Sequence, residues 1–238
     1  MLISLKNQKI LVIAPHPDDE VIGCGGLIAR AKREGGKVFV LYFTVGAAKD
    51  FSRKGSSTAG ERILEMHRVA RFLKIDGHRL AFPGDDYHLR LDAIPQREII
   101  NEIERGKKIS LESIRPTILL TCDPNDYNQD HRAASLATIT AARPVPNTFK
   151  SLPRIVLTYE HSVSTWTTDA VPSAPNLYVG LSPRDLAAKL AALRLYRSQL
   201  KHPRGPFSPY AVATLAKLRG LQAGLDYAEA FSLKRLGT

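Results

Sequence analysis

The sequence predicts an α/β fold, a Rossmann-like three-layer sandwich with a mainly parallel sheet and a C-terminal helical extension. Two observations predict it. Short apolar runs alternate with longer amphipathic stretches, which is the pattern of βαβ units. Polar turns directly follow several of the apolar runs, where parallel strands end. The 238 residues suffice for a single domain, 1–238, in which about 177–238 form a strand-helix extension.

The predicted strands share a high content of β-branched, leucine and aromatic residues. We expect them at Ile10–Ala14, Val38–Thr44, Arg79–Phe82, Pro116–Cys122, Arg154–Glu160 and, as a short strand, Leu177–Leu181. The predicted helices carry apolar stripes at helical spacing. They are expected at about Val21–Glu34, Glu61–Lys74, Pro95–Lys108, Arg132–Ala142, Pro183–His202 and, whole or as a broken pair, Tyr210–Phe231.

Two long polar stretches are expected as loops. Residues 46–60 leave the same sheet edge as the first motif described below, which makes them a candidate lid or substrate loop. Residues 162–176 are rich in Ser, Thr and Pro and also have the composition of a loop.

The composition is that of an ordinary globular protein, with 44% hydrophobic and 24% charged residues. Lys and Arg number 34 against 23 Asp and Glu, a formal charge of +11 that favours anionic partners such as phosphate- or nucleotide-bearing substrates. The basic residues are dispersed, so we predict no nucleic-acid partner. Two cysteines are too few for a disulfide framework. We also expect no membrane partner, no signal peptide and a cytoplasmic protein.

The stretch Pro15–Glu20 is the most informative part of the chain. It follows the first apolar strand directly, and ligands bind at the carboxyl ends of strands in open α/β sheets. His and carboxylate side chains are ordinary ligands of divalent metals such as zinc. The spacing of His16 and Asp19 lets both hold a metal while Asp18, between them, faces its water.

A simpler interpretation of this stretch is a helix N-cap, because Asp near a helix N-terminus is favoured by capping and by the helix dipole. A second polar stretch, Asn128–His131, favours the metal interpretation. It lies between a later core strand and its helix, so the architecture of the first motif is repeated and the two loops can converge above the sheet.

Together the two motifs resemble the PIG-L/LmbE family of zinc-dependent N-deacetylases. The likeness continues over nearly the whole chain. The further segments that carry it are Arg62 and Glu65, Phe82–Asp85, Tyr196–Gln199, Arg219–Gly220 and Tyr227–Phe231.

The resemblance implies that His16, Asp19 and His131 hold one Zn²⁺, or another divalent cation, per chain. It implies Asp18 as the general base that activates water for attack on an acetamido carbonyl. The products would be acetate and a free amine, usually on a glucosamine-like sugar. Arg62 and Asp85 are expected to contact this small-molecule substrate, and relatives of this kind often form homo-oligomers.

The second motif departs from the family pattern at Asn128, where many members have a His that assists the oxyanion or the leaving group. Asn can donate a hydrogen bond to an oxyanion but cannot act as an acid. Asp130 is expected to hold Asn128 or to buttress the metal ligands. His161, at the end of a predicted strand, is a candidate for supplying the missing imidazole.

The leading hypothesis is therefore a metal-dependent hydrolase that removes an acetyl group from an N-acetylated sugar or sugar derivative. Two alternatives keep the site. One is an amidase on a thiol conjugate or another non-sugar amide, and the other is a degenerate metal- or sugar-binding protein without turnover. A nucleotide-binding Rossmann module is disfavoured, because charged residues separate the first strand from Gly23.

Overall fold

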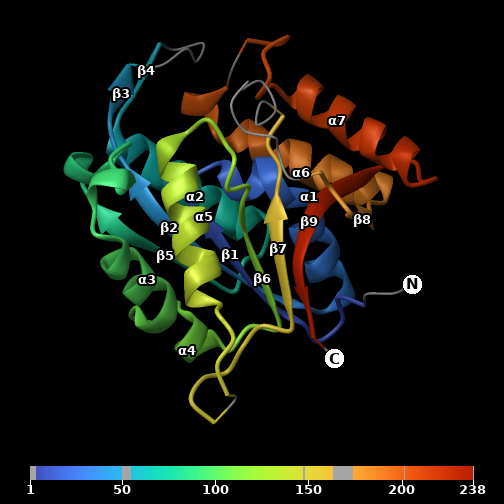
Figure 1. The fold of residues 1–238 in the computed structure, drawn as a ribbon. Coiled ribbons are helices and arrows are strands. Elements are labelled where there is room, and N and C mark those ends of the chain that lie inside the picture. The colour runs from blue at the N-terminus through green and yellow to red at the C-terminus, as the bar shows by residue number, and fades with distance from the viewer. Residues whose placement is uncertain (1–3, 50–54, 147, 163–173, 201, 238) are drawn as a thin grey trace.

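The computed structural model describes residues 4–49, 55–146, 148–162, 174–200 and 202–237. A seven-stranded sheet in the order β5-β2-β1-β6-β7-β9-β8 forms the centre of the molecule (Figure 1). The strands of this sheet are β1 (Lys9–Ala14), β2 (Lys37–Val45), β5 (Gly77–Pro83), β6 (Ile118–Cys122), β7 (Ile155–Tyr159), β8 (Leu177–Gly180) and β9 (Ala228–Leu236). A separate two-stranded ribbon joins β3 (Ala48–Lys49) to β4 (Ser56–Ser57).

The sheet is mainly parallel, as predicted. Strand β1 is an interior strand, third in the sheet order, and pairs in parallel with β2 and β6. Val12 is therefore opposite Val40 on one side and Leu120 on the other. Strands β5 and β7 extend the parallel part on either side. The residues of β1 from Ile10 onward are buried. The first motif, which directly follows this strand, therefore begins inside the core.

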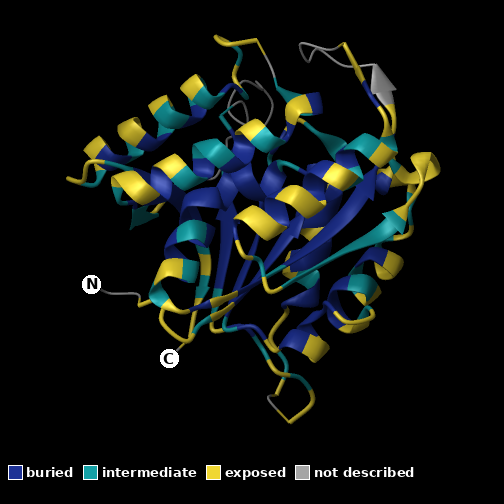
Figure 2. Cartoon of the chain, turned by 180° about the vertical axis from the view of Figure 1, so that it is seen from behind, coloured by how far each residue is buried: buried dark blue, intermediate teal, exposed yellow. Residues whose placement is uncertain are grey.

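Helices cover both faces of the sheet. In Figure 1, α5 crosses in front of the strands and α1 and α6 lie behind them; Figure 2 shows the buried residues concentrated in the sheet and on the inner sides of the helices. The α-helices are α1 (Asp19–Glu34), α2 (Ala59–Phe72), α3 (Gln96–Arg105), α4 (Leu111–Ile114), α5 (Gln129–Ala141), α6 (Pro183–Leu195) and α7 (Pro209–Gln222). Among the described residues there are also three 3₁₀ turns, η1 (Asp85–Tyr87), η2 (Leu91–Ala93) and η3 (Arg197–Gln199).

Helix ends follow local signals in the sequence. The Ser182 side chain accepts a hydrogen bond from the Asp185 backbone N–H, and the Asp185 carboxylate accepts one from the Ser182 backbone N–H. These two bonds form a capping box at the start of α6. Thr58 is the N-cap of α2, and its side chain accepts a hydrogen bond from the Glu61 backbone N–H.

Two helix predictions near the C-terminus are wrong. Helix α6 ends at Leu195, not near His202, because the following turn is drawn toward α2: the Ser198 side chain and backbone N–H both bond to Glu65. The stretch expected to be helical up to Phe231 changes to strand β9 after α7. Gly224, at a φ of 69°, turns the chain between the two elements, since its left-handed conformation favours glycine.

The C-terminal region is consequently part of the main sheet. Strand β9 runs antiparallel to both β7 and β8 and joins them. Parts of both predicted long loops, residues 50–54 and 163–173, lie outside the described residues. Within the described part of the chain, no helix is both long and apolar enough to cross a membrane.

Candidate metal centre

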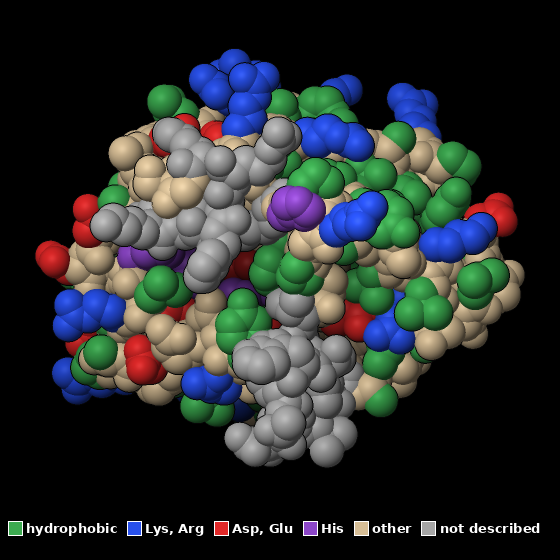
Figure 3. Space-filling model, turned by 90° about the horizontal axis from the view of Figure 1, so that it is seen from above, with side chains coloured by type: hydrophobic (Ala, Val, Ile, Leu, Met, Phe, Trp, Pro, Cys, Tyr) green, Lys and Arg blue, Asp and Glu red, His purple; other side chains and the backbone are tan. Residues whose placement is uncertain are grey.

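The two motifs meet at the carboxyl ends of β1, β6 and β7. His16 and Asp19 follow β1, His131 lies in the first turn of α5 after β6, and His161 follows β7. All four residues are buried. Seen from above, histidine and acidic side chains lie at the bottom of a hollow in this face (Figure 3).

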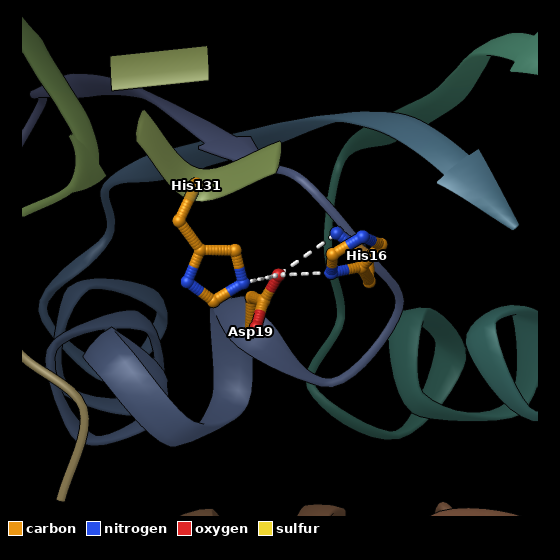
Figure 4. A group of neighbouring side chains, drawn as sticks. All are labelled: His16, Asp19 and His131. Carbon is orange, nitrogen blue, oxygen red and sulfur yellow. Dashed lines mark hydrogen bonds and ion pairs between the residues drawn. The ribbon is translucent and has the colours of Figure 1, made fainter. Parts of the chain in front are cut away.

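His16, Asp19 and His131 form a group that can hold a metal ion (Figure 4). The Asp19 Oδ2 atom lies 3.4 Å from His16 Nδ1 and 3.4 Å from His131 Nε2. One ligand atom from each residue lies within 4.8 Å of the other two. Two imidazoles and one carboxylate that converge in a buried site fit a divalent cation such as zinc and leave coordination positions for water and substrate.

The outer nitrogen of each imidazole contacts a further carboxylate. Asp130 Oδ2 lies 2.9 Å from His16 Nε2, and its Oδ1 accepts the backbone N–H of Leu91. Asp126 Oδ2 lies 3.1 Å from His131 Nδ1. Carboxylates in this position orient metal-binding imidazoles and raise their basicity. Asp130 was expected either to hold Asn128 or to support a metal ligand. Its carboxylate contacts the imidazole of His16, a proposed ligand.

Asp126, two residues before the second motif, was not among the site residues predicted from the sequence. It contacts a second imidazole, since His161 Nδ1 lies 3.5 Å from the same Asp126 Oδ2 atom. His161 Nε2 lies 3.6 Å from Asp19 Oδ1. His161 is therefore a member of the cluster, and Asp126, His131 and His161 make up a second group with metal-ligand spacing.

The electrostatics of the cluster follow from these contacts. Burial alone would lower the pKa of His131, but the carboxylates of Asp19 and Asp126 raise it to about 10. Burial would raise the pKa of Asp126, whereas His131 and His161 hold that pKa well below its usual range. Without a metal the site thus favours protonated imidazole beside carboxylate, so that metal binding must release protons.

Asp18 differs from its neighbours in exposure and in backbone conformation. It is the one residue of Pro15–Glu20 that is not buried, and its φ of 113° and ψ of −27° lie in the left-handed region. Although Asp18 occupies the N-cap position of α1, its side chain makes no capping hydrogen bond. The simple N-cap interpretation therefore does not account for this carboxylate, and strained residues of this kind cluster at functional sites.

Asn128 is the N-cap of α5. Its side-chain oxygen accepts the backbone N–H of Asp130, and its own backbone N–H donates to Asp126 Oδ1. Asn128 thereby fixes the backbone of the loop that carries both Asp126 and Asp130. Its residue type suits a helix start, a role that needs no catalytic explanation.

The two predicted substrate contacts lie in different surroundings. Arg62, on α2, is buried, and its Nη1 lies 3.2 Å from His88 Nε2. The His88 ring in turn lies 5.3 Å from the His16 ring, between centroids. Asp85 is exposed, and its Oδ1 accepts the backbone N–H of Ala47, which ties it to the root of the loop after β2.

His88 is a further residue that sequence reasoning missed. Burial, together with the nearby His16 and Arg62, lowers its pKa to about 4, so its ring is neutral at physiological pH. Because a guanidinium can only donate, Nε2 accepts the bond from Arg62 and the ring proton is on Nδ1. The only signal in the sequence was its place in the polar turn after β5.

The fold and the cluster define a candidate metal centre at the carboxyl edge of a Rossmann-like sheet. The sequence matches the PIG-L family model, described as GlcNAc-PI de-N-acetylase, over residues 11–142. This chain therefore belongs to the PIG-L family, as its motifs predicted.

Relatives with deacetylase names cover most of the chain. It is 30% identical over 199 residues to the uncharacterized deacetylase YaiS of Escherichia coli K12, which covers 81% of this chain and 92% of that protein. It is 31% identical over 235 residues to the diacetylchitobiose deacetylase of Thermococcus kodakarensis, with 93% and 81% covered. The crystal structure of the conserved protein TT1542 from Thermus thermophilus matches with a TM-score of 0.71 at 30% identity and covers 94% of each chain.

Proposed function

We propose that this protein is a zinc-dependent hydrolase that removes the acetyl group from an N-acetylated sugar and yields acetate and a free amine. The observation that carries the proposal is the buried cluster of His16, Asp19 and His131 with the strained Asp18 beside it. Membership of the PIG-L family and the diacetylchitobiose deacetylase relative support the choice of an N-acetylated sugar.

In this proposal, His16, Asp19 and His131 hold one divalent cation per chain. Such a cation polarises a carbonyl oxygen and makes water easier to deprotonate. Asp18 takes the proton from the attacking water and then passes a proton to the leaving amine. Asp126 and Asp130 keep the imidazoles in the orientation and tautomer that the metal requires.

Arg62 lies on the substrate side, where its guanidinium and the neutral His88 are hydrogen-bond donors beside the cluster. A substrate contact for Asp85 and a catalytic contact for Asn128 or His161 stay predictions. The formal charge of +11 supports a substrate that carries a phosphate or nucleotide group. A cytoplasmic location and assembly into a homo-oligomer also stay predictions.

The first experiment is to measure bound metal together with acetate release from a panel of N-acetylated sugars. The panel includes N-acetylglucosamine, its phosphates, its nucleotide-linked form and diacetylchitobiose, and it compares the wild type with Asp18→Ala. Stoichiometric zinc with acetate release that is lost in the variant would support the proposal. Zinc without acetate from any sugar would favour the amidase or the degenerate binding protein, and a folded protein that binds no metal would overturn the assignment.

A further inference from the structure

Glu20, the last residue of the first motif, has no place in the chemistry described so far. It is completely buried, and among the described residues no Lys, Arg or His forms an ion pair with it. A buried carboxyl group is costly unless its hydrogen bonds are made. An apolar side chain at this position would cost less, so the two hydrogen bonds that the Glu20 carboxyl group accepts call for an explanation.

Both bonds of Glu20 connect to particular places in the fold. Its Oε2 accepts the backbone N–H of Asp18 at 3.1 Å. Its Oε1 accepts the hydroxyl of Tyr196 at 2.6 Å. Tyr196 is completely buried and stands at the C-terminal end of α6, so Glu20 connects the C-terminal part of the chain to the backbone of Asp18.

The peptide group that Glu20 holds belongs to the strained residue. At a φ of 113°, Asp18 adopts a conformation that a non-glycine residue leaves unless its surroundings hold it. The rest of the turn holds it from the other side, because the Asp18 carbonyl accepts the backbone N–H groups of Val21 and Ile22. The Glu20 carboxyl group is therefore the side-chain partner that fixes the Asp18 N–H, and with it the direction in which the Asp18 side chain leaves the backbone.

We propose that Glu20 and Tyr196 are positioning residues, which hold Asp18 in its left-handed conformation so that its carboxylate is placed for proton transfer. This inference rests on the proposed function, in which Asp18 is the base. Tyr196 contributes by fixing the Glu20 carboxyl group from the opposite side. The C-terminal segment thus takes part in the site without contacting substrate or metal.

The test compares four variants of the zinc-loaded full-length protein, with the best substrate from the panel. Tyr196→Phe removes only the hydroxyl, and Glu20→Ala removes both hydrogen bonds. Glu20→Gln keeps an acceptor for the Asp18 N–H and a polar partner for Tyr196. Tyr159→Phe is the matched control, because it also removes a buried hydroxyl, which donates to the Ile13 carbonyl and not to Glu20.

For Tyr196→Phe, which loses one hydrogen bond, we expect kcat to fall about tenfold, and for Glu20→Ala, which loses two, we expect it to fall at least as far. KM and bound zinc should stay unchanged in both variants. Glu20→Gln should restore most of kcat. Tyr159→Phe should lower the melting temperature but keep kcat. A merely structural role would lower the melting temperature in all of these variants and leave kcat per folded, zinc-loaded molecule at the wild-type value, which would overturn the inference.

Asp18→Ala separates failure of this inference from failure of the proposed function. If Asp18→Ala abolishes turnover and Tyr196→Phe and Glu20→Ala do not change kcat, the positioning role is wrong and the proposed base stands. If Asp18→Ala keeps turnover, Asp18 is not the base and both proposals fall. If Glu20→Ala does not fold, the comparison of Tyr196→Phe with Tyr159→Phe decides.

Discussion

Asp126 Oδ2 lies 3.1 Å from His131 Nδ1, on the side of the imidazole opposite to Asp19. This contact fixes which nitrogen of His131 faces the proposed metal position. Loss of the Asp126 carboxylate should therefore weaken metal binding while the three proposed ligands His16, Asp19 and His131 stay in place.

We expect Asp126→Asn to weaken zinc binding by roughly 10–100-fold, because His131 loses the carboxylate that orients its ring and increases its basicity. Competition with a chromophoric chelator measures this affinity. The matched control is Asp123→Asn, since Asp123 is a buried carboxylate of the same loop that bonds to the Asn125 backbone N–H instead. Equal zinc affinity in both variants would contradict the role given to Asp126.

The strain at Asp18 gives a prediction about stability. Glycine adopts a φ of 113° without the steric cost of a Cβ atom, so Asp18→Gly should unfold with a free energy about 1 kcal/mol higher than that of Asp18→Ala. Urea unfolding of the metal-free proteins measures the difference. Both variants should lack turnover, because neither has the carboxylate. If the glycine variant is less stable than the alanine variant, the backbone at this position is not strained.

Glu229 joins strand β9 to helix α1. Its two carboxylate oxygens accept the backbone N–H groups of Gly26 and Leu27, just beyond the non-helical residue Cys24, and Oε1 also pairs with the buried Lys189. Glu229→Ala should lower the free energy of unfolding by about 3–5 kcal/mol, because it leaves a buried ammonium group without its partner.

The double variant Glu229→Ala/Lys189→Met tests the reason for that loss. Because the double variant leaves no unpaired charge, it should be destabilised by less than the sum of the two single variants. Urea unfolding of all four proteins completes the cycle. If the effects of the two single variants simply add up, the ion pair between Lys189 and Glu229 does not couple α6 to β9.

Glu20 gives a prediction about pH. Burial raises the pKa of its carboxyl group from 4.5 to about 8. Between pH 4.5 and about pH 8, the folded protein keeps a proton on Glu20 that the unfolded chain has lost. The contribution of Glu20 to the free energy of unfolding is therefore full below about pH 4.5 and falls as the pH rises to about 8.

The slope expected from this single group is about 1.4 kcal/mol per pH unit. Glu20→Gln cannot titrate and should lack this part of the pH dependence. Urea unfolding of both metal-free proteins between pH 5 and about pH 8 provides the comparison. Parallel stability curves for the two proteins would show that Glu20 ionises normally in the fold.

Local signals in the sequence were sufficient for much of the fold and for the residues of the first motif. The apolar run that ends at Ala14, followed by Pro15–Glu20, predicts a core strand with a polar turn, and the structure has β1 and the start of α1 there. Ser182-Pro183 correctly predicted the start of α6. These signals depend on residues within one or two turns of each other, so the sequence shows them directly.

The C-terminal strand could not be predicted in the same way. Ala228–Leu236 becomes a strand because it pairs with β7 and β8 and buries Glu229 against α1. Its composition also suits a helix, and the partners that decide between the two lie many residues away along the chain.

The sequence by itself determined the fold class, the family and the residues of the two motifs. Only the tertiary structure decided which carboxylate contacts which imidazole: Asp130 contacts His16, and Asp126 contacts His131. It also decided that Arg62 bonds to His88 and that Glu20 bonds to Tyr196. The physical reason is that strand order and loop packing set these contacts. A side chain's hydrogen-bonding capacity can be read from its residue type, but its partner is known only when distant segments are brought to the same edge of the sheet.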